Sequence, residues 1–476
     1  MLLESDRPAV STRTFLGRVN SLNLFRPIAT FAASSAAMNV EFLSELFQSI
    51  AERGRGLLRR RAALPPADAD FASMFETLLA HRGEASGLAL AEDILGRWVT
   101  LDGEQRRHFL QIMCARFGVD RQKLAAAIAA YQNDPSDRAA QGVHRAAEPR
   151  RQEIIRRLNM APGGTASIVE MRTLVLDSLK TDRELATLDT DFLHLLSSWF
   201  NRGFLVLRRI DWSTSATILE KIIRYEAVHK ISGWDDLRRR LEPEDRRCFG
   251  FFHPQLVDEP LIFVEVALSH DMPDAIGPLL APERKPITSG AATTATFYSI
   301  SNTQRGLAGV SFGDFLIKQV VEELRGDLPQ IDTFVTLSPM PAFRSWLTEE
   351  YAEAEDVLDQ ATRNALLSLG ADWAPENADV ADELLQAAAR YLLLAKTSGG
   401  LPVDPVARFH LRNGARVERI NFAADLSKRG LGQAFGLMVN YLYDLDEIER
   451  NHEAFTATGE IAASAAVEKL LGVPGA

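Results

Sequence analysis

The chain has 476 residues, enough for two or three domains. Its hydrophobic and charged fractions, 46% and 25%, are those of a globular protein. The net charge of −11 argues against a nucleic-acid partner. No apolar run reaches membrane-spanning length, which argues against a membrane partner. The two cysteines, Cys114 and Cys248, fit neither a zinc motif nor a disulfide framework, which favours a reducing cytoplasm.

The first 37 residues differ in composition from the rest of the chain. They are rich in Ser, Thr and Arg and poor in acids, a composition that can mark an organelle transit peptide. A disordered tail, or a start codon assigned too early with Met38 as the true start, explains the same composition. We favour this second interpretation for residues 1–37, because composition alone is a weak signal.

Residues 38–202 carry apolar side chains at helical spacing, beginning with VEFLSELFQSIAERGRGLLRR at 40–60. The polar stretch 135–153 predicts a connector or an exposed helix. No strand signal precedes residue 203. We therefore predict an all-α helical domain over residues 38–202.

Residues 203–476 alternate between strand-like and helical segments, which predicts a mixed α/β domain and makes the whole chain α+β. A helix is expected over 312–325, with Gly326 as the glycine that follows its last turn. The strand-like segments are GFLVLRRIDW, CFGFFHP, PLIFVEVAL, TATFYSIS, DTFVTLSP, VERINFAAD and GLMVNYLYDL.

A glycine-rich turn joins one of these strands to the helix that follows it, in TFYSISNTQRGLAGVSFGDFLIKQ at 296–319. Gly306, Gly309 and Gly313 indicate either a positive φ or a close approach to the backbone. A strand–turn–helix unit also directs free N–H groups at one point, where a phosphate can bind. The turn is neither GxGxxG nor a P-loop, so a plain strand–helix turn remains the alternative to a phosphate site.

Ser338 lies in VTLSPMPAF, directly after a strand-like run. Open α/β sheets bind ligands beyond the carboxyl ends of their strands, and Pro339 and Pro341 would stiffen this loop. A functional hydroxyl at Ser338 is therefore one interpretation. The other is that Ser338 caps a helix that starts near Pro341.

His410 lies near the end of a short predicted helix, with Gly414 as the expected residue after its cap. A lone histidine on such a helix is more often structural than functional. A helix C-terminus favours the cationic form, however, and would raise the pKa of His410. Other histidines, including His229, have the sequence surroundings of surface residues, and no spacing indicates a metal site.

Four segments together resemble the malonyl-CoA decarboxylase family: FYSISNTQRGLAGVSFGDFLIKQVVEEL, TLSPMPAFRSWL, FHLRNGARVERINFAAD and GLMVNYLYDL. The resemblance is dense from about residue 203 to 450 and looser over the helical part. It implies that residues 203–476 form a GNAT-like acyl-CoA-binding catalytic domain.

The resemblance also implies the site residues. Ser338 and His410 would be the catalytic pair, with Ser299 and Tyr443 as further polar residues of the catalytic site. The residues that bind coenzyme A would be Ser338 and the turn formed by Ala308, Gly309, Val310, Ser311, Phe312, Gly313 and Asp314.

The reaction implied is the decarboxylation of malonyl-CoA to acetyl-CoA and CO2, with the thioester carbonyl as electron sink and no cofactor or metal. His410 would protonate the enolate at C2, and Ser338 would position or relay the proton. The resemblance further implies a homo-oligomer, a dimer or tetramer, built through the helical domain. The chain ends in GVPGA and lacks a peroxisomal Ser-Lys-Leu, which favours a bacterial cytoplasmic protein.

Three alternatives remain at this stage. A GNAT-like acyltransferase would share the phosphate site but would need an acceptor. An acyl-CoA sensor would bind without turnover, and an interaction protein would use the helical domain and keep only a vestigial site. The presence of both Ser338 and His410 counts against the last two.

Overall fold

The structure is a computed structural model. It describes residues 70–80, 83–310, 316–348, 364–366, 368–369 and 380–472. The segment 1–37 and the helix expected at 40–60 lie outside these residues, as does the part of the glycine-rich turn at 311–314. Within the described residues, no helix is both long enough and apolar enough to cross a membrane.

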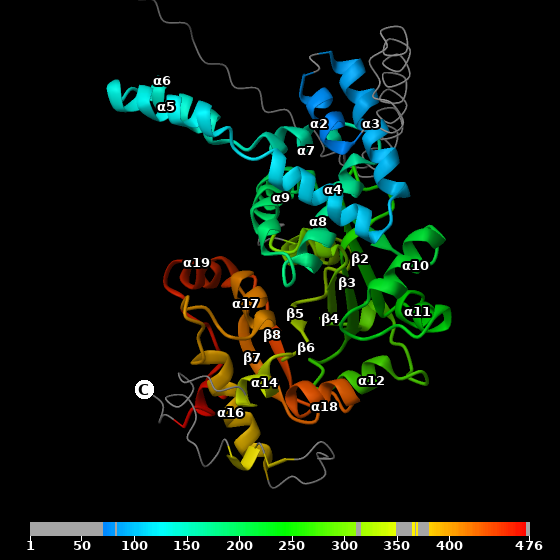
Figure 1. Ribbon diagram of the computed structural model, residues 1–476. Helices are drawn as coiled ribbons and strands as arrows, with labels where there is room; N and C mark the ends of the chain where they lie inside the picture. The colour runs from blue at the N-terminus through cyan, green and yellow to red at the C-terminus, as the bar shows by residue number, and fades with distance from the viewer. Residues whose placement is uncertain are drawn as a thin grey trace, which may run out of the picture.

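Helices form the first part of the described chain, and Figure 1 shows most of them gathered at one end of the molecule. Local signals set their ends. At the start of α4, for example, the Asp102 side chain accepts the Gln105 N–H and the Gln105 side chain accepts the Asp102 N–H. The helices are α2 (Phe71–Ala80), α3 (Glu84–Thr100), α4 (Gly103–Arg116), α5 (Arg121–Asn133), α6 (Asp137–Ala147), α7 (Arg150–Asn159), α8 (Gly164–Ser178) and α9 (Ala186–Trp199).

Helices α5 and α6 form a hairpin that extends away from the other helices (Figure 1). Neither helix contains a buried residue, whereas α8 alone buries eight. The polar stretch at 135–153 is therefore largely an exposed helix, one of the two alternatives that the sequence left open.

The rest of the chain builds an eight-stranded sheet in the order β1-β2-β3-β4-β5-β8-β6, with β7 paired to β8. Each strand-like segment of the sequence supplies one of these strands, and DTFVTLSP supplies both β5 and β6. The strands are β1 (Val206–Ile210), β2 (Arg246–Phe252), β3 (Pro260–Ser269), β4 (Thr294–Asn302), β5 (Thr333–Thr336), β6 (Ser338–Pro339), β7 (Arg416–Asn421) and β8 (Met438–Leu442).

Helices cover both faces of the sheet. Residues of α10 and α11 pack on β2 and β3 in one apolar cluster, whereas α13 belongs to the large cluster on the other face. The longer helices of this part are α10 (Ala216–Tyr225), α11 (Trp234–Leu241), α13 (Leu316–Asp327), α16 (Ala381–Leu393), α17 (Pro405–Arg412) and α19 (Ile448–Thr458). The shorter ones are α12 (Ile276–Leu280), α14 (Phe343–Thr348), α18 (Lys428–Ala434) and α20 (Ala465–Lys469).

Strands β4 and β5 are parallel, and α13 lies between them in the chain. They pair only from Thr294 with Thr333 to Phe297 with Thr336, after which β6 pairs with β8 instead. Because β4 continues to Asn302, strands β4 and β5 separate beyond Phe297. Strand β4 also has a register shift at this level, which leaves Tyr298 as an extra residue opposite β3.

Gly306 explains part of the glycine-rich turn. A Cβ at this position would lie 2.0 Å from the carbonyl oxygen of Val169 in α8, and the Arg172 guanidinium donates to the Gly306 carbonyl at 2.9 Å. This glycine is therefore required where the helical part packs closely against the sheet part. Gly326 was predicted wrongly: it lies inside α13, which continues to Asp327.

The expected α+β class is confirmed, since a helical region precedes a mixed-sheet region. One continuous apolar cluster includes residues of both regions, from Ala72 to Val467. The last helix of the first region ends at Trp199 and the first strand begins at Val206. The domain boundary at 202/203 stays a prediction.

Candidate active site

Ser338 lies at the point where β4 and β5 separate. It forms the two-residue strand β6 with Pro339 and pairs with Val439 of β8. The next helix, α14, begins only at Phe343, so Ser338 is not its cap. The interpretation of Ser338 as a helix cap is therefore wrong, because backbone pairing with β8 holds this residue in the sheet.

Helix α17 places His410 against the same strands. The helix begins at Asp404, whose buried carboxylate accepts the N–H groups of Val406 and Ala407 and the hydroxyl of Tyr391. It ends at Asn413, and Gly414 follows with a φ of 84°, as the sequence predicted. Both ends of the helix are thus fixed, so the position of His410 is set by the backbone.

The structure brings Ser338, His410 and Tyr443 together, and we call them the serine–histidine–tyrosine group. Ser338 Oγ lies 3.0 Å from His410 Nε2, and His410 Nδ1 lies 2.7 Å from the Tyr443 hydroxyl. The Ser338 hydroxyl donates to Thr336 Oγ1 at 2.9 Å, and the Tyr441 N–H also donates to that oxygen. These contacts form one continuous chain of hydrogen bonds.

The group is isolated from solvent and carries no charge. His410 is 2% exposed and Tyr443 is 1% exposed. Burial lowers the pKa of His410 to about 3 and raises the pKa of Tyr443 well above its usual value. The expectation that a helix C-terminus would raise the pKa of His410 is wrong, because the loss of solvation outweighs the helix dipole.

The hydrogen bond that Ser338 donates to Thr336 sets the directions of the other two, since Ser338 Oγ must then accept from His410 Nε2. Tyr443 keeps its phenolic proton and donates it to His410 Nδ1. The neutral imidazole therefore carries its proton on Nε2 and donates it to Ser338 Oγ, which in turn donates to Thr336. The Ser338 hydroxyl carries a proton, and the His410 N–H can replace that proton once it is given away. The group is therefore suited to transfer a proton to a substrate.

Two further residues complete the surroundings of His410 and were missed from the sequence. The Tyr441 ring stacks on the imidazole with centroids 4.6 Å apart, and Thr336 accepts from Ser338. Tyr441 lies on β8 and Tyr443 directly follows its end, so the two side chains, two positions apart, lie on one face if the extended backbone continues. That alternation was visible in MVNYLYDL and could have identified Tyr441.

The turn predicted to bind coenzyme A is described only as far as residue 310. Gly309 has a φ of 78°, a backbone conformation that favours glycine, and Ala308 and Val310 flank it. Ser311, Phe312, Gly313 and Asp314 lie outside the described residues. Their role in binding stays a prediction.

Ser299 lies in a different polar cluster. Its hydroxyl donates to both carboxylate oxygens of Glu226, at 2.9 and 2.7 Å, and the structure shows no hydrogen bond from it to Ser338 or His410. Ser301 also donates to Glu226. The catalytic role expected for Ser299 stays a prediction.

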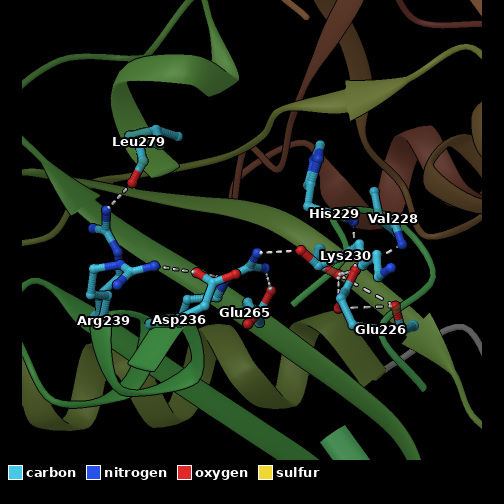
Figure 2. A network of polar contacts seen from close by, with 12 residues as sticks. Glu226, Val228, His229, Lys230, Asp236, Arg239, Glu265 and Leu279 are labelled. Carbon is cyan, nitrogen blue, oxygen red and sulfur yellow. Dashed lines mark hydrogen bonds and ion pairs between the residues drawn. The ribbon is translucent and has the colours of Figure 1, made fainter. Parts of the chain in front are cut away.

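We call the charged cluster around Ser299 the Glu226–Glu265 network; Figure 2 shows Glu226 beside the loop residues Val228, His229 and Lys230. The Arg240 guanidinium lies 3.1 Å from Glu265 Oε2 in this network. Burial, with a contribution from the Glu226 charge, raises the pKa of Glu265 to about 8 against the opposing effect of Arg240.

His229 also differs from its expected surface position. Its Nε2 atom is buried and has no hydrogen-bond partner among the described residues. The local sequence could not reveal this, because neighbours of His229 such as Tyr298 and Asp425 come from distant segments. Within the described ranges, no three His, Cys, Asp or Glu side chains lie together as metal ligands would.

The fold and the serine–histidine–tyrosine group define an α+β protein with a mixed sheet and a buried serine–histidine pair. Residues 203–475 match the malonyl-CoA decarboxylase C-terminal domain, and residues 117–200 match the malonyl-CoA decarboxylase N-terminal domain. The chain belongs to the malonyl-CoA decarboxylase family.

Individual relatives agree with this assignment. The crystal structure of malonyl-CoA decarboxylase from Rhodopseudomonas palustris is 57% identical with a TM-score of 0.80, over 84% of this chain and 98% of that one. The enzyme from Agrobacterium vitis is 54% identical with a TM-score of 0.79, over 85% and 100%. The mitochondrial malonyl-CoA decarboxylase of Anser anser anser is 34% identical over 76% of this chain and 79% of its own length.

Proposed function

We propose that this protein decarboxylates malonyl-CoA to acetyl-CoA and CO2 and that Ser338 and His410 transfer the proton. The 3.0 Å contact between Ser338 Oγ and His410 Nε2, buried at the separation of β4 and β5, carries the proposal. Family membership supports the substrate.

The reaction makes three demands on the protein. The carboxylate must be held out of the plane of the thioester, the charge that develops on the carbonyl oxygen must be stabilised, and C2 must be protonated. Loss of CO2 leaves an electron pair at C2 that delocalises into the thioester carbonyl. A hydrogen-bond donor directed at the resulting oxyanion contributes about 2.7–4 kcal/mol.

The serine–histidine–tyrosine group would meet the third demand. The Ser338 hydroxyl turns from Thr336 and gives its proton to C2, while the Nε2 proton of His410 moves to Ser338 Oγ. The Tyr443 proton moves to His410 Nδ1 in the same step, so the negative charge that leaves C2 resides on the Tyr443 oxygen until one solvent proton restores the group. Since His410 is neutral, it acts through its N–H and not as an imidazolium.

Coenzyme A would bind beside the turn at 308–314. Gly309 adopts a positive φ there, and the turn leads into α13. A helix N-terminus offers unpaired N–H groups and the positive end of a dipole, both of which suit a diphosphate. Beyond Phe297, β4 has no β5 partner, and the thioester end of the substrate would reach Ser338 between these two strands.

We also propose that the protein forms a homo-oligomer through the helical region. The α5–α6 hairpin contains no buried residue and exposes Ile128 and Tyr131, each 41% exposed. Replacing both with Glu should lower the mass measured by light scattering. An unchanged mass would exclude this hairpin as the contact. A cytoplasmic location stays a prediction from composition.

One experiment separates the proposed reaction from the alternatives. The purified protein is incubated with malonyl-CoA alone, and the products are identified by mass. Acetyl-CoA and CO2 without an added acceptor are expected. An acyltransferase would require an acceptor, and a sensor would leave the substrate unchanged, so either result would contradict the proposal.

A further inference from the structure

The turn that follows β4 packs against the helical region. A Cβ on Gly306 would lie 2.0 Å from the Val169 carbonyl oxygen and 2.8 Å from Thr173 Oγ1. Both of these residues belong to α8, which lies at the sheet end of the helical region (Figure 1). A Cβ on Gly309 would lie 3.7 Å from Leu193 of α9. Two helices that precede the sheet in the chain therefore touch the beginning of this turn.

The sheet part holds the first end of the turn. The Thr303 N–H donates to the Leu261 carbonyl at 3.0 Å, and the Gln304 side chain donates to Glu259 at 3.1 Å. In the described part of the turn beyond Gln304, two polar contacts reach another element, and both come from α8. The polar contacts that fix residues 305–310 are thus supplied by the helical region.

Arg172 makes the stronger of these two contacts. Its guanidinium donates to the Gly306 carbonyl at 2.9 Å and, through Nε, to Asp189 of α9 at 2.8 Å. Arg172 is 2% exposed, so solvent does not compete with either contact. The second contact joins Arg305 to Asp177 at 2.5 Å, but both side chains are exposed, and exposed ion pairs contribute little.

The Asp189 carboxylate fixes the direction of the Arg172 guanidinium. An arginine side chain ends in a planar fork, so a carboxylate bound at Nε sets where the other N–H groups point. Residues of α8 and α9 pack together in the large apolar cluster, which holds both helices in place. The donor to the Gly306 carbonyl therefore has one defined position.

The rest of the described turn moves with Gly306. The Ala308 N–H donates to the Arg305 carbonyl at 3.0 Å. The Val310 N–H likewise donates to the Leu307 carbonyl at 3.0 Å. Leu307 and Val310 are also buried in the apolar cluster that includes both regions. A shift of the Gly306 carbonyl would therefore displace the turn as far as Val310.

We propose that Arg172 is a positioning residue for the binding of coenzyme A. It holds the Gly306 carbonyl and thereby places the segment 308–314, which would bind the diphosphate. Arg172 acts through the backbone of the turn and does not itself contact the substrate. The inference rests on the coenzyme A site proposed above and gives the helical region a part in substrate binding.

Loss of Arg172 should weaken binding at the diphosphate and leave the chemical step intact. Without its donor the turn occupies its binding position for only part of the time, and the apparent affinity falls by that fraction. A hydrogen bond from a charged group corresponds to a factor of about ten or more. In Arg172→Met, KM for malonyl-CoA should rise about tenfold while kcat stays within about twofold, the pattern of lost uniform binding.

A second substrate separates this positioning role from general damage to the fold. Malonyl-pantetheine keeps the malonyl thioester but lacks the nucleotide and its diphosphate. The ratio of kcat/KM for malonyl-CoA to kcat/KM for malonyl-pantetheine is measured on one sample, so the folded fraction cancels. Arg172→Met should lower this ratio about tenfold. Arg172→Lys, whose single ammonium cannot replace the fork, should lower it by a smaller factor.

Arg151→Met is the matched control. Arg151 is also a buried arginine of the helical region and pairs with the buried Asp191. Its other hydrogen bonds in the described structure reach the carbonyls of Cys114 and Thr187, which also belong to the helical region. Arg151→Met should therefore destabilise the fold as Arg172→Met does, yet leave the ratio of the two substrates unchanged.

The outcomes separate this inference from the proposed function. Absence of CO2 release from malonyl-CoA in the unmodified protein would overturn the proposed function and this inference with it. Normal release with equal kcat/KM for the two substrates would overturn the inference alone. So would an unchanged ratio in Arg172→Met, or an equal fall in Arg151→Met. Arg172→Lys decides the question in the same way if Arg172→Met does not fold.

Discussion

Two buried polar clusters lie on this sheet, and they handle charge in opposite ways. The serine–histidine–tyrosine group is neutral throughout, with His410 and Tyr443 both held in their uncharged forms by burial. The Glu226–Glu265 network places Arg240 among acidic side chains, with Glu265 fully buried.

The comparison teaches how each cluster can be tolerated in the interior. A neutral chain of hydrogen bonds needs no counter-ion until it gives up a proton. A charged cluster is stable only while its partners stay paired, because an isolated buried charge is costly. The charged network therefore holds the loop at 226–230 on β4, whereas the neutral group is free to do chemistry.

The largest expected effect follows from removing the neutral group. Ser338→Ala and His410→Ala should each lower turnover of malonyl-CoA about 10²- to 10⁴-fold, the usual contribution of positioned proton transfer. Binding of coenzyme A should be kept. Release of CO2 is the measurement, with Ser345→Ala and His108→Ala, both exposed, as controls. Near-normal CO2 release from either site variant would remove that residue from the mechanism.

Substitutions in the charged network should change the stability of the fold. Above pH 8, where Glu265 is ionised, Arg240→Met leaves this carboxylate without its cation and should lower the free energy of unfolding by about 3–5 kcal/mol. Urea unfolding measures this, and Arg239→Met, at an exposed neighbour, is the control. A loss below about 1 kcal/mol would show that the network does not depend on this ion pair.

Two tyrosines, Tyr441 on β8 and Tyr443 directly after it, sharpen the assignment within the neutral group. Tyr443→Phe removes the hydroxyl that contacts His410 Nδ1 and should lower kcat about tenfold, the loss of one hydrogen bond to an ionising group. Tyr441→Phe removes a hydroxyl that has no partner among the described residues, so kcat should be almost unchanged. Equal losses in both variants would mean that packing, and not the Nδ1 contact, sets the rate.

The smallest effect is on the pH dependence of stability, where the clusters should act in opposite directions. The pKa of His410 falls from 6.5 to about 3 on folding, so its contribution is present above pH 6.5 and is lost as pH falls towards 3. The pKa of Glu265 rises from 4.5 to about 8, so its contribution is present below pH 4.5 and is lost as pH rises through 8.

Urea unfolding across the pH range tests this. His410→Asn should reduce the proton uptake on unfolding between about pH 4 and 6 by about one proton. Glu265→Gln should reduce the proton release on unfolding between about pH 5 and 7 by a similar amount. Shifts of the same sign in both variants would contradict the comparison.

The order of helices and strands could be predicted because local patterns determine them. Apolar spacing marked the helices from α2 to α9 except α6, which lies in the polar stretch 135–153, and β-branched and aromatic runs marked every strand. Gly414 was recognised because a helix end needs a left-handed residue. Gly326 was misplaced, because a glycine near a helix end is tolerated inside the last turn when packing favours it.

The candidate site could be predicted only in part from the sequence. Ser338 and His410 stood out through their positions in their segments and through the family resemblance. The pKa of His410 was predicted in the wrong direction, because desolvation depends on the tertiary packing of residues such as Tyr441. Gly306 looked like part of a phosphate turn, yet its contact is with Val169, more than a hundred residues earlier.

The sequence by itself determined the helices and strands, their order and the side chains capable of catalysis. Hydrophobic periodicity and turn-forming residues act over only a few neighbours along the chain. Only the tertiary structure decided which polar side chains meet and which are charged. Those properties depend on solvation, and solvation is set by segments far apart in the chain, as the contact of His410 with Ser338 and Tyr443 shows.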